Sequence, residues 1–404
     1  MPPDGGGVTA TPRVAIVQGQ ARSALRLAAA FGAAAVVAIV APHRTGAWLP
    51  LHLFLVGSVL LAVSGAARLF AVTWSAGEPA GTRLVTAQRW LIAAGAAGLA
   101  VGREGSLPVG ALAAAGLCVT AGLVLLAVLL SMEVRRGRVR RFRPALHFYL
   151  AALGFGVVGT GLGAALVTGS EGLRDAHVTV NLLGLVGLVI AGTLPFFIAT
   201  QARMKMAPRA TPRRLHTALG VLAVAVVAAG AAELAHRPAV AGVALTGYVA
   251  GLLYLVTLLP VPGTRQWRWA GPRLLQLGLG VAWWAAVVAV AAGRSLAGWA
   301  AFPEPLVVTL VIGGFLQILV ASLAYLAPVL RGGGHQQLSA GFRATRSWVA
   351  LVAGNLAALA WIGGQHRLAE AGLVVVAVDV ATRAARLARD AQSHGSDREV
   401  MAGV

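Results

Sequence analysis

Long apolar segments recur along the whole chain and alternate with short gaps that carry arginine. A helix needs about 20 mostly apolar residues to cross the hydrocarbon core of a membrane. Only 11% of the residues are charged and the mean hydropathy is +0.79, which excludes an ordinary soluble domain. The sequence therefore predicts an all-α fold, a polytopic transmembrane helical bundle.

Dividing the chain at proline, glycine and charge clusters gives about twelve predicted spans. They cover residues 23–42, 47–72, 84–102, 107–132, 145–169, 175–200, 214–232, 238–262, 272–293, 303–330, 346–364 and 367–388. Because the gaps are short, one membrane domain is predicted for residues 19–390, between a disordered N-terminal tail (1–18) and a C-terminal tail (391–404). The first tail lacks the basic-then-apolar order of a signal peptide, and no internal repeat stands out.

The basic residues predict which way the spans point, because cytoplasmic loops are enriched in lysine and arginine. With the N-terminus inside, most of the 33 basic residues fall in inward segments, Arg68 and Arg89 among them. The outward segments hold Arg44, Arg103, Arg174, Arg237, Arg294 and Arg367. This distribution predicts a multi-pass cell-membrane protein with both termini cytoplasmic, in contact with the lipid bilayer. It also accounts for the net charge of +20 without a nucleic-acid partner.

Two of the nine histidines enter predicted spans from the outer side. His52 lies in AWLPLHLFLVGSVLL and His177 opens HVTVNLLGLVGLVIAG, so both rings are predicted at a similar shallow depth. An ionisable side chain within a span indicates a functional site. The alternative is an interfacial histidine bonded to a neighbouring carbonyl or water. His147 and His216 are predicted near the inner surface, His147 as an interfacial residue and His216 without a second histidine beside it.

The surroundings of His177 favour the functional interpretation. Asn181 follows one helical turn later, so the two side chains share a face that Gly184 continues. The preceding span has Gly159 and Gly163 in GxxxG spacing, which lets two helices approach closely. The sequence therefore predicts tight packing of spans five and six, with the His177–Asn181 face turned into the bundle.

Other polar residues within the spans are predicted to have structural roles. Gln317 and Asn355 are expected to form hydrogen bonds between helices. Asp379 has Arg383 four residues later, which predicts a local ion pair. The single cysteine, Cys118, excludes an internal disulfide framework and a cysteine metal site. No phosphate-binding loop, HExxH motif or hydrolase triad is present.

Twelve predicted spans, inward termini and histidines that enter spans two and six from outside resemble subunit I of the haem-copper oxidases. The stretch HVTVNLLGLVGLVIAGTLPFF (177–197) is similar to the family's His-x-His-x-Asn-Leu-Leu-Gly signature. The NnrS-type membrane proteins of nitric-oxide responses are a closer likeness within this group. By this resemblance, His177 matches the first copper-type ligand on span six, and His52 matches the low-spin haem ligand on span two.

The chain departs from this family at the other ligand positions. Thr179 stands where the signature often has a second histidine, span seven lacks the adjacent histidine pair, and span ten has no histidine. Because three nitrogen ligands normally hold such a copper, an oxygen-reducing binuclear centre is not expected. The resemblance then implies one haem on His52 or His177, or copper on both rings with a loop histidine. The loop histidines predicted at that end are His43, His236 and His366.

Two classes of function therefore remain open. The first is a haem- or copper-binding membrane protein in electron transfer or in nitrogen-oxide or copper handling. In it, His52 and His177 are ligands, Asn181 orients the site, and a redox partner protein docks on the outer side. The second is a twelve-span transporter, which suits the span count but lacks a charged cluster at the membrane midplane. A metal-free structural subunit is the third alternative.

Overall fold

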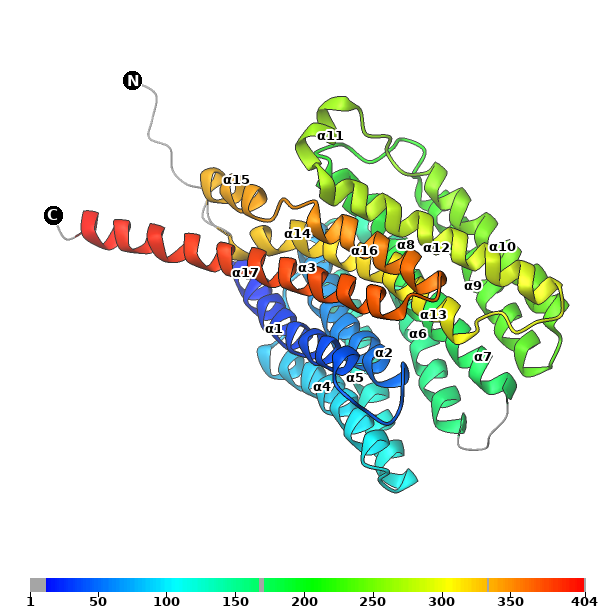
Figure 1. Ribbon diagram of the computed structural model, residues 1–404. Helices are drawn as coiled ribbons and strands as arrows, with labels where there is room; N and C mark the ends of the chain where they lie inside the picture. Colours follow the sequence, from blue (N-terminus) through cyan, green and yellow to red (C-terminus); the bar gives the residue numbers. More distant parts are fainter. Residues whose placement is uncertain (1–11, 167–170, 333, 403–404) are drawn as a thin grey trace.

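The computed structural model describes residues 12–166, 171–332 and 334–402, and these residues form helices without a β-strand. The elements are α1 (Pro12–Val40), α2 (Trp48–His52), η1 (Leu53–Val59), α3 (Leu60–Ser75), α4 (Thr82–Glu104), α5 (Val109–Arg135), η2 (Arg140–Phe142), α6 (Arg143–Ala165), α7 (Glu171–Thr179), η4 (Val180–Gly187), α8 (Leu188–Gln201), α9 (Pro212–Leu234), α10 (Pro238–Thr257), α11 (Thr264–Ala270), α12 (Pro272–Leu296), α13 (Glu304–Thr309), η5 (Leu310–Leu316), α14 (Gln317–Arg331), α15 (His335–Ala344), α16 (Val349–Ile362) and α17 (His366–Ala402). Figure 1 shows the long helices running alongside one another as a bundle. The predicted all-α, polytopic helical bundle is confirmed.

Eleven helices in the described part of the chain are long and apolar enough to cross a membrane. The twelfth predicted span, 367–388, lies in α17, which packs along α16. Arg367, Glu370, Asp379 and Arg383 interrupt the apolar residues of this segment, so it is more charged than the other spans. Asp379 Oδ2 and Arg383 Nη2 lie 2.8 Å apart, which confirms the predicted ion pair.

Both chain ends are more helical than the predicted tails. α1 begins at Pro12, so residues 12–18 already belong to the first helix, and residues 1–11 lie outside the described part. Proline suits the first turn of a helix because its missing N–H would have no partner there. α17 continues through most of the predicted C-terminal tail to Ala402, in a segment that contains no proline to end it.

Three spans contain a π-helical segment between two α-helical parts. They are α2–η1–α3, α7–η4–α8 and α13–η5–α14, and they are the three most buried of the eleven. We call them the central helices. A π-helical turn forms i→i+5 hydrogen bonds and is found frequently at functional sites. The core of the molecule therefore contains a backbone irregularity in each of its three innermost helices.

The same arrangement of four helices occurs three times along the chain. In each group the first helix packs on a central helix, and the last two pack on each other as a hairpin. The first helices are α1, α6 and α12, and the hairpins are α4–α5, α9–α10 and α16–α17. Neighbouring groups meet where α5 packs on α6, α10 on α12 and α1 on α17. The outer helices of the three groups thereby surround the central helices. The three groups show no evident repeat in their sequences. Helix packing in membranes depends on where small residues fall, so groups with different sequences can pack in the same way.

A buried polar network joins α1, α3, α4 and α5. Arg68 forms an ion pair with Glu133, and its Nη2 also donates to Gln20 Oε1 at 2.9 Å. Arg89 Nη1 donates to the carbonyl of Gln20 at 2.7 Å, and the N–H of Ala80 donates to Glu133 Oε1 at 3.0 Å. The charge pattern counts Arg68 and Arg89 as loop charges, whereas both are buried in the structure. Gln20 of α1 and Glu133 of α5 lie at the same depth in the bundle and supply the acceptors that hold these two arginines inside it.

The two predicted interhelical hydrogen bonds are present. Gln276 Nε2 of α12 donates to Gln317 Oε1 of α14 at 2.6 Å, with both side chains buried. Trp283 Nε1 of α12 donates to Asn355 Oδ1 of α16 at 2.8 Å. Each bond satisfies a polar side chain that lipid could not solvate.

Candidate functional site

Two glycines of α6 receive the side chains of His177 and Asn181. A Cβ atom at Gly159 would overlap the amide group of Asn181, and one at Gly163 would lie 2.8 Å from His177 Cε1. Real Cβ atoms essentially never make contacts this short, so only glycine allows α6 to approach the central helix α7–η4 this closely. The predicted packing of spans five and six is confirmed, with the His177–Asn181 face turned into the bundle.

The ring of His177 is oriented by α6 and by its own helix. Nδ1 lies 2.9 Å from the carbonyl oxygen of Gly159. Because a carbonyl oxygen only accepts, Nδ1 carries the proton in the neutral ring. Asn181 donates from Nδ2 to the carbonyl of His177 at 2.8 Å and lies 3.3 Å from the ring Nδ1. Asn181 therefore lies directly against the imidazole, as its spacing of one helical turn predicts.

His52 is held within its own helical turn. Its Nδ1 lies 2.8 Å from the carbonyl oxygen of Trp48, and its ring stacks on the Trp48 indole with centroids 4.0 Å apart. His52 is the last residue of α2 and is followed at once by η1, while His177 lies three residues before η4. Each histidine therefore lies where a central helix changes from α-helical to π-helical geometry. We call this end of the bundle, where α2 and α7 begin, the histidine end.

Both rings leave the second nitrogen uncommitted. Within the described residues, neither His52 Nε2 nor His177 Nε2 has a hydrogen-bond partner, while each Nδ1 faces a backbone carbonyl. This arrangement satisfies the interfacial alternative, in which a carbonyl alone holds the ring. It is also the arrangement of metal-ligating histidines, whose other ring N–H is almost always donated to a carbonyl, a carboxylate or water. The two interpretations differ in whether the Nε2 lone pair binds a metal ion.

The two histidines are near neighbours that do not touch. The two rings lie within electrostatic range of each other, but they are not among the stacked or edge-to-face pairs of the described residues. No group of three or more histidine, cysteine, aspartate or glutamate side chains is placed to hold a metal ion in this part of the chain. The structure therefore offers at most two protein nitrogens at this place.

The loop histidines do not join this pair. His43 engages both nitrogens, with Nδ1 at 2.9 Å from the carbonyl of Ala41 and Nε2 at 2.7 Å from that of Gly46. His366 lies edge-on to the ring of Trp361 with centroids 4.4 Å apart. His236 packs beside Gly172, at the start of α7. His43 and His366 are held by contacts within their own loops, and His236 contacts the first turn of α7.

A buried glutamate bonded to Thr179 is missed by the sequence reasoning. Thr179, which is fully buried, donates its hydroxyl to Glu233 Oε1 at 2.8 Å. Glu233 is itself buried, and its Oε2 has no hydrogen-bond partner among the described residues. Glu233 lies near the end of α9, one residue beyond the predicted span 214–232. In the sequence it therefore looks like a loop residue. Thr179, where the resembled signature often has histidine, therefore holds this carboxyl group to the central helix.

His216, the one histidine of predicted span seven, meets a histidine of another helix. His147 Nδ1 and His216 Nε2 lie 2.8 Å apart, with ring centroids separated by 5.0 Å. Both histidines are exposed near the first turns of α6 and α9, two packed helices whose N-termini meet at the end opposite His52. The two rings are distant in sequence and similar in depth, so only the pairing of α6 with α9 brings them together.

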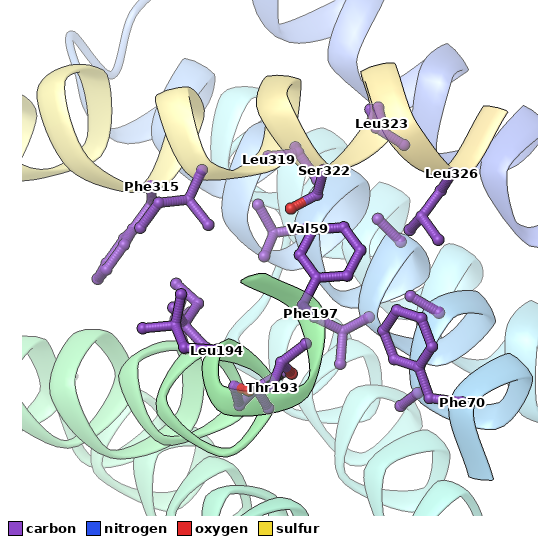
Figure 2. A pocket seen from close by; sticks show the side chains of 18 of the residues that line it. Val59, Phe70, Thr193, Leu194, Phe197, Phe315, Leu319, Ser322, Leu323 and Leu326 are labelled. Atoms are coloured by element: carbon purple, nitrogen blue, oxygen red, sulfur yellow. Dashed lines mark hydrogen bonds between the residues drawn. The ribbon is translucent and has the colours of Figure 1, made fainter. Parts of the chain in front are cut away.

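The central helices line a partly open cavity of about 100 Å³. Figure 2 shows its wall, formed mainly by α3, α8 and α14, with the side chains of Phe70, Phe197 and Ser322 turned toward one space. The lining is apolar apart from a few hydroxyl groups, among them those of Thr193 and Tyr149, which are bonded to each other at 2.8 Å. A mainly apolar wall of this kind favours small apolar guests.

The cavity is separate from the histidines. It begins at Val59, seven residues after His52, which is about 10 Å along a helix. Pockets for drug-sized ligands measure about 300–1,000 Å³, so this cavity admits only a molecule of a few atoms. A porphyrin does not fit it, and no histidine is among its lining residues.

The loop between α1 and α2 is expected to be pH-sensitive through His43. Hydrogen bonds from its ring to the carbonyls of Ala41 and Gly46 raise the pKa of His43 above the usual 6.5. The protonated ring donates from both nitrogens, so its stabilisation of the loop is complete below the ordinary pKa and is lost as pH rises through the raised one. NMR titration of the histidine Cε1–H signals, with His43→Ala to assign the peak, should give a midpoint above 6.5. A midpoint at or below that value would contradict the two-carbonyl geometry.

A scan against protein-family models and a search of curated proteins find no match to this chain. The site is therefore interpreted from its own geometry. What is established is a multi-span helical membrane protein in which His52, His177 and Asn181 gather at one end of the central helices.

Proposed function

We propose that this membrane protein binds a copper ion at the histidine end, through Nε2 of His52 and Nε2 of His177. Its role would be electron transfer or the handling of nitrogen oxides or copper. The observation that carries the proposal is that each Nδ1 is bonded to a backbone carbonyl while each Nε2 lacks a partner among the described residues. Neutral imidazole is a good ligand for copper, and an oriented, neutral ring needs no rearrangement of its own to coordinate.

Asn181 acts in this proposal as a positioning residue. Its amide lies against the His177 ring and holds the helical turn that carries it. Partners of this kind typically change metal affinity by about 10–100-fold when they are removed. Two protein ligands leave the remaining positions of the metal to water or to a small substrate.

We propose copper rather than haem as the bound group. The cavity between the central helices is too small for a porphyrin and is lined by no histidine. A single ion requires only that the two Nε2 lone pairs reach it. Copper, when bound, supplies one-electron redox chemistry at this end of the bundle. The arginine distribution predicts that this end faces outward, where a redox partner protein would dock.

The size of the cavity supports a small, uncharged substrate. A space of about 100 Å³ with an apolar wall does not suit sugars, amino acids or other polar solutes. A diatomic or triatomic nitrogen oxide is small and uncharged enough to enter it. Because the cavity lies along the same central helices as the histidines, this geometry favours nitrogen-oxide handling over the transport of polar nutrients.

The test is the metal content of the purified protein and of matched variants. The full chain is expressed with copper and haem precursors supplied, purified in detergent, and assayed for copper and iron by mass spectrometry. We expect about one copper per chain, with nitrogen couplings from imidazole in the electron paramagnetic resonance spectrum. His52→Ala and His177→Ala should each lose it. His43→Ala is the matched control at the same end, because both of its ring nitrogens are already engaged.

Three results would end the proposal. The first is the absence of copper from the wild type, which leaves the metal-free structural or transporter alternatives. The second is the persistence of copper in both His52→Ala and His177→Ala. Finally, iron with a Soret band would show that the chain holds haem in a conformation different from the one described.

A further inference from the structure

Three arginines converge at the end of the bundle opposite the histidine end. Arg203 follows the last residues of α8, Arg273 is the second residue of α12, and Arg346 follows α15. The charges of Arg203 and Arg346 both act on Arg273. Arg346 packs over Gly271, with its Nε 2.9 Å from the position that a Cβ there would take. Three like charges are therefore gathered around the first turn of α12.

Arg273 is buried without a counter-charge. Its residue is 6% exposed, and its Nε and Nη2 have no hydrogen-bond partner among the described residues. The ion pairs in this part of the chain involve other arginines. The rings of Phe342 and Trp269 lie 4.7 Å and 5.4 Å from its Cζ. Aromatic faces attract the charge, but they leave the N–H donors unsatisfied, and a buried, unpaired charge is costly.

A second orphaned donor lies in the same place. The indole Nε1 of Trp269 is buried without a hydrogen-bond partner in the described structure. Arg203 lies over the same indole, with its Cζ 3.4 Å from the ring centroid. Tyr325 lies within electrostatic range of both Arg203 and Arg273. Buried donors from α11 and α12 thus converge beside the Tyr325 ring without a hydrogen-bond partner among the described residues.

From this arrangement we propose that Arg203, Arg273, Arg346, Trp269 and Tyr325 form a binding site for a phosphate group, which we call the arginine site. A phosphate carries negative charge and several acceptor oxygens, and arginine N–H groups match its geometry. The amino-terminal end of α12 adds positive potential at the same point. A single carboxylate has too few oxygens to satisfy donors from three helices.

The site is open to a ligand from the membrane surface. Arg203 and Arg346 are exposed, whereas Arg273 lies behind them. Figure 1 shows α11 and α15 at this end, beside the ends of the long helices. The phosphate could belong to an anionic lipid headgroup or be free in solution, and both sources present the same chemistry. The positive-inside distribution predicts that this end faces the cytoplasm.

The test compares three probes that share parts of one structure. The full-length protein in a non-ionic detergent is titrated with inorganic phosphate, with dioctanoyl-phosphatidylglycerol, and with dioctanoylglycerol, which has the acyl chains without the phosphate. Binding is measured by calorimetry and by the shift in thermal midpoint. A phosphate-bearing probe should bind the wild type, and Arg273→Gln or Arg346→Gln should weaken it by about tenfold or more. Arg213→Gln, an exposed arginine at the same end, should leave the affinity unchanged.

The outcomes separate the sources and the alternatives. Binding of phosphatidylglycerol alone identifies a lipid headgroup, and binding of both phosphate-bearing probes shows that free phosphate also enters. The proposal is overturned if neither binds, if dioctanoylglycerol binds as tightly as phosphatidylglycerol, or if Arg346→Gln retains wild-type affinity. Arg346 is exposed, so this variant decides the question even if Arg273→Gln fails to fold.

Discussion

Replacing Glu133 with glutamine is expected to lower the free energy of unfolding by about 3–5 kcal/mol. Glutamine keeps the volume of the side chain and removes its charge, so Arg68 stays positively charged inside the bundle without a partner. Both residues are almost completely buried, at 2% and 1% exposure. Arg68 Nε lies 3.1 Å from Glu133 Oε1, and the same oxygen accepts the N–H of Ala80. One substitution therefore disturbs the contacts among α1, α3 and α5.

Unfolding by sodium dodecyl sulfate in mixed micelles, followed by circular dichroism, measures this effect. Glu78→Gln is the matched control, because Glu78 is an exposed carboxylate in the loop between α3 and α4; surface changes of this kind are usually within about 0.5 kcal/mol. The double variant Arg68→Met with Glu133→Leu should recover much of the loss, since it leaves no unpaired charge. Equal stability of Glu133→Gln and Glu78→Gln would show that the buried pair does not hold the bundle.

Gly159→Ala is expected to destabilise the protein by about 1–3 kcal/mol, the usual cost of overfilling a packed interface. The added methyl group would meet the whole amide of Asn181 rather than the flexible end of a long side chain. Asn181 would have to leave the His177 ring, and α6 would have to move away from α7–η4. The Gly159 carbonyl that fixes the His177 tautomer would move with it. Copper affinity should therefore fall together with stability if the proposed metal site is correct.

The same helix supplies the control for this prediction. A Cβ at Gly161 meets no heavy atom within 4 Å, so Gly161→Ala should be neutral or slightly stabilising, by up to about 1 kcal/mol. Both variants replace glycine with alanine two positions apart, and they differ only in which face of α6 receives the methyl group. If Gly159→Ala unfolds at the same free energy as Gly161→Ala, close contact between α6 and the central helix is not required.

The sequence predicts the local features of the site well. The glycine spacing in α6 and the turn-length separation of His177 from Asn181 depend only on helix geometry, and both expectations are confirmed. That Gln317 and Asn355 form hydrogen bonds between helices follows from the high cost of an unpaired polar group in lipid. In each case the residue type and its position in a span are enough to predict the kind of contact.

Contacts between distant segments are harder to predict. Arg68 has the composition of a loop charge, and only the alignment of α1 and α5 beside α3 supplies its acceptors. Glu233 lies at a helix end, and only the packing of α9 on α7 makes Thr179 its donor. The orphaned donors of Arg273 and Trp269 likewise become visible only once α11, α12 and α15 are placed together.

The sequence by itself determined the membrane-spanning, all-helical architecture and the helical faces that carry His177 and Asn181. Those properties follow from hydropathy and from a period of 3.6 residues, which are local. Only the tertiary structure decided the threefold grouping of helices, the cavity between the central helices, the neighbourhood of His52 and His177, and the cluster of arginines at the opposite end. These depend on which helices become neighbours, and that choice is made by the summed packing of many weak, nonlocal contacts.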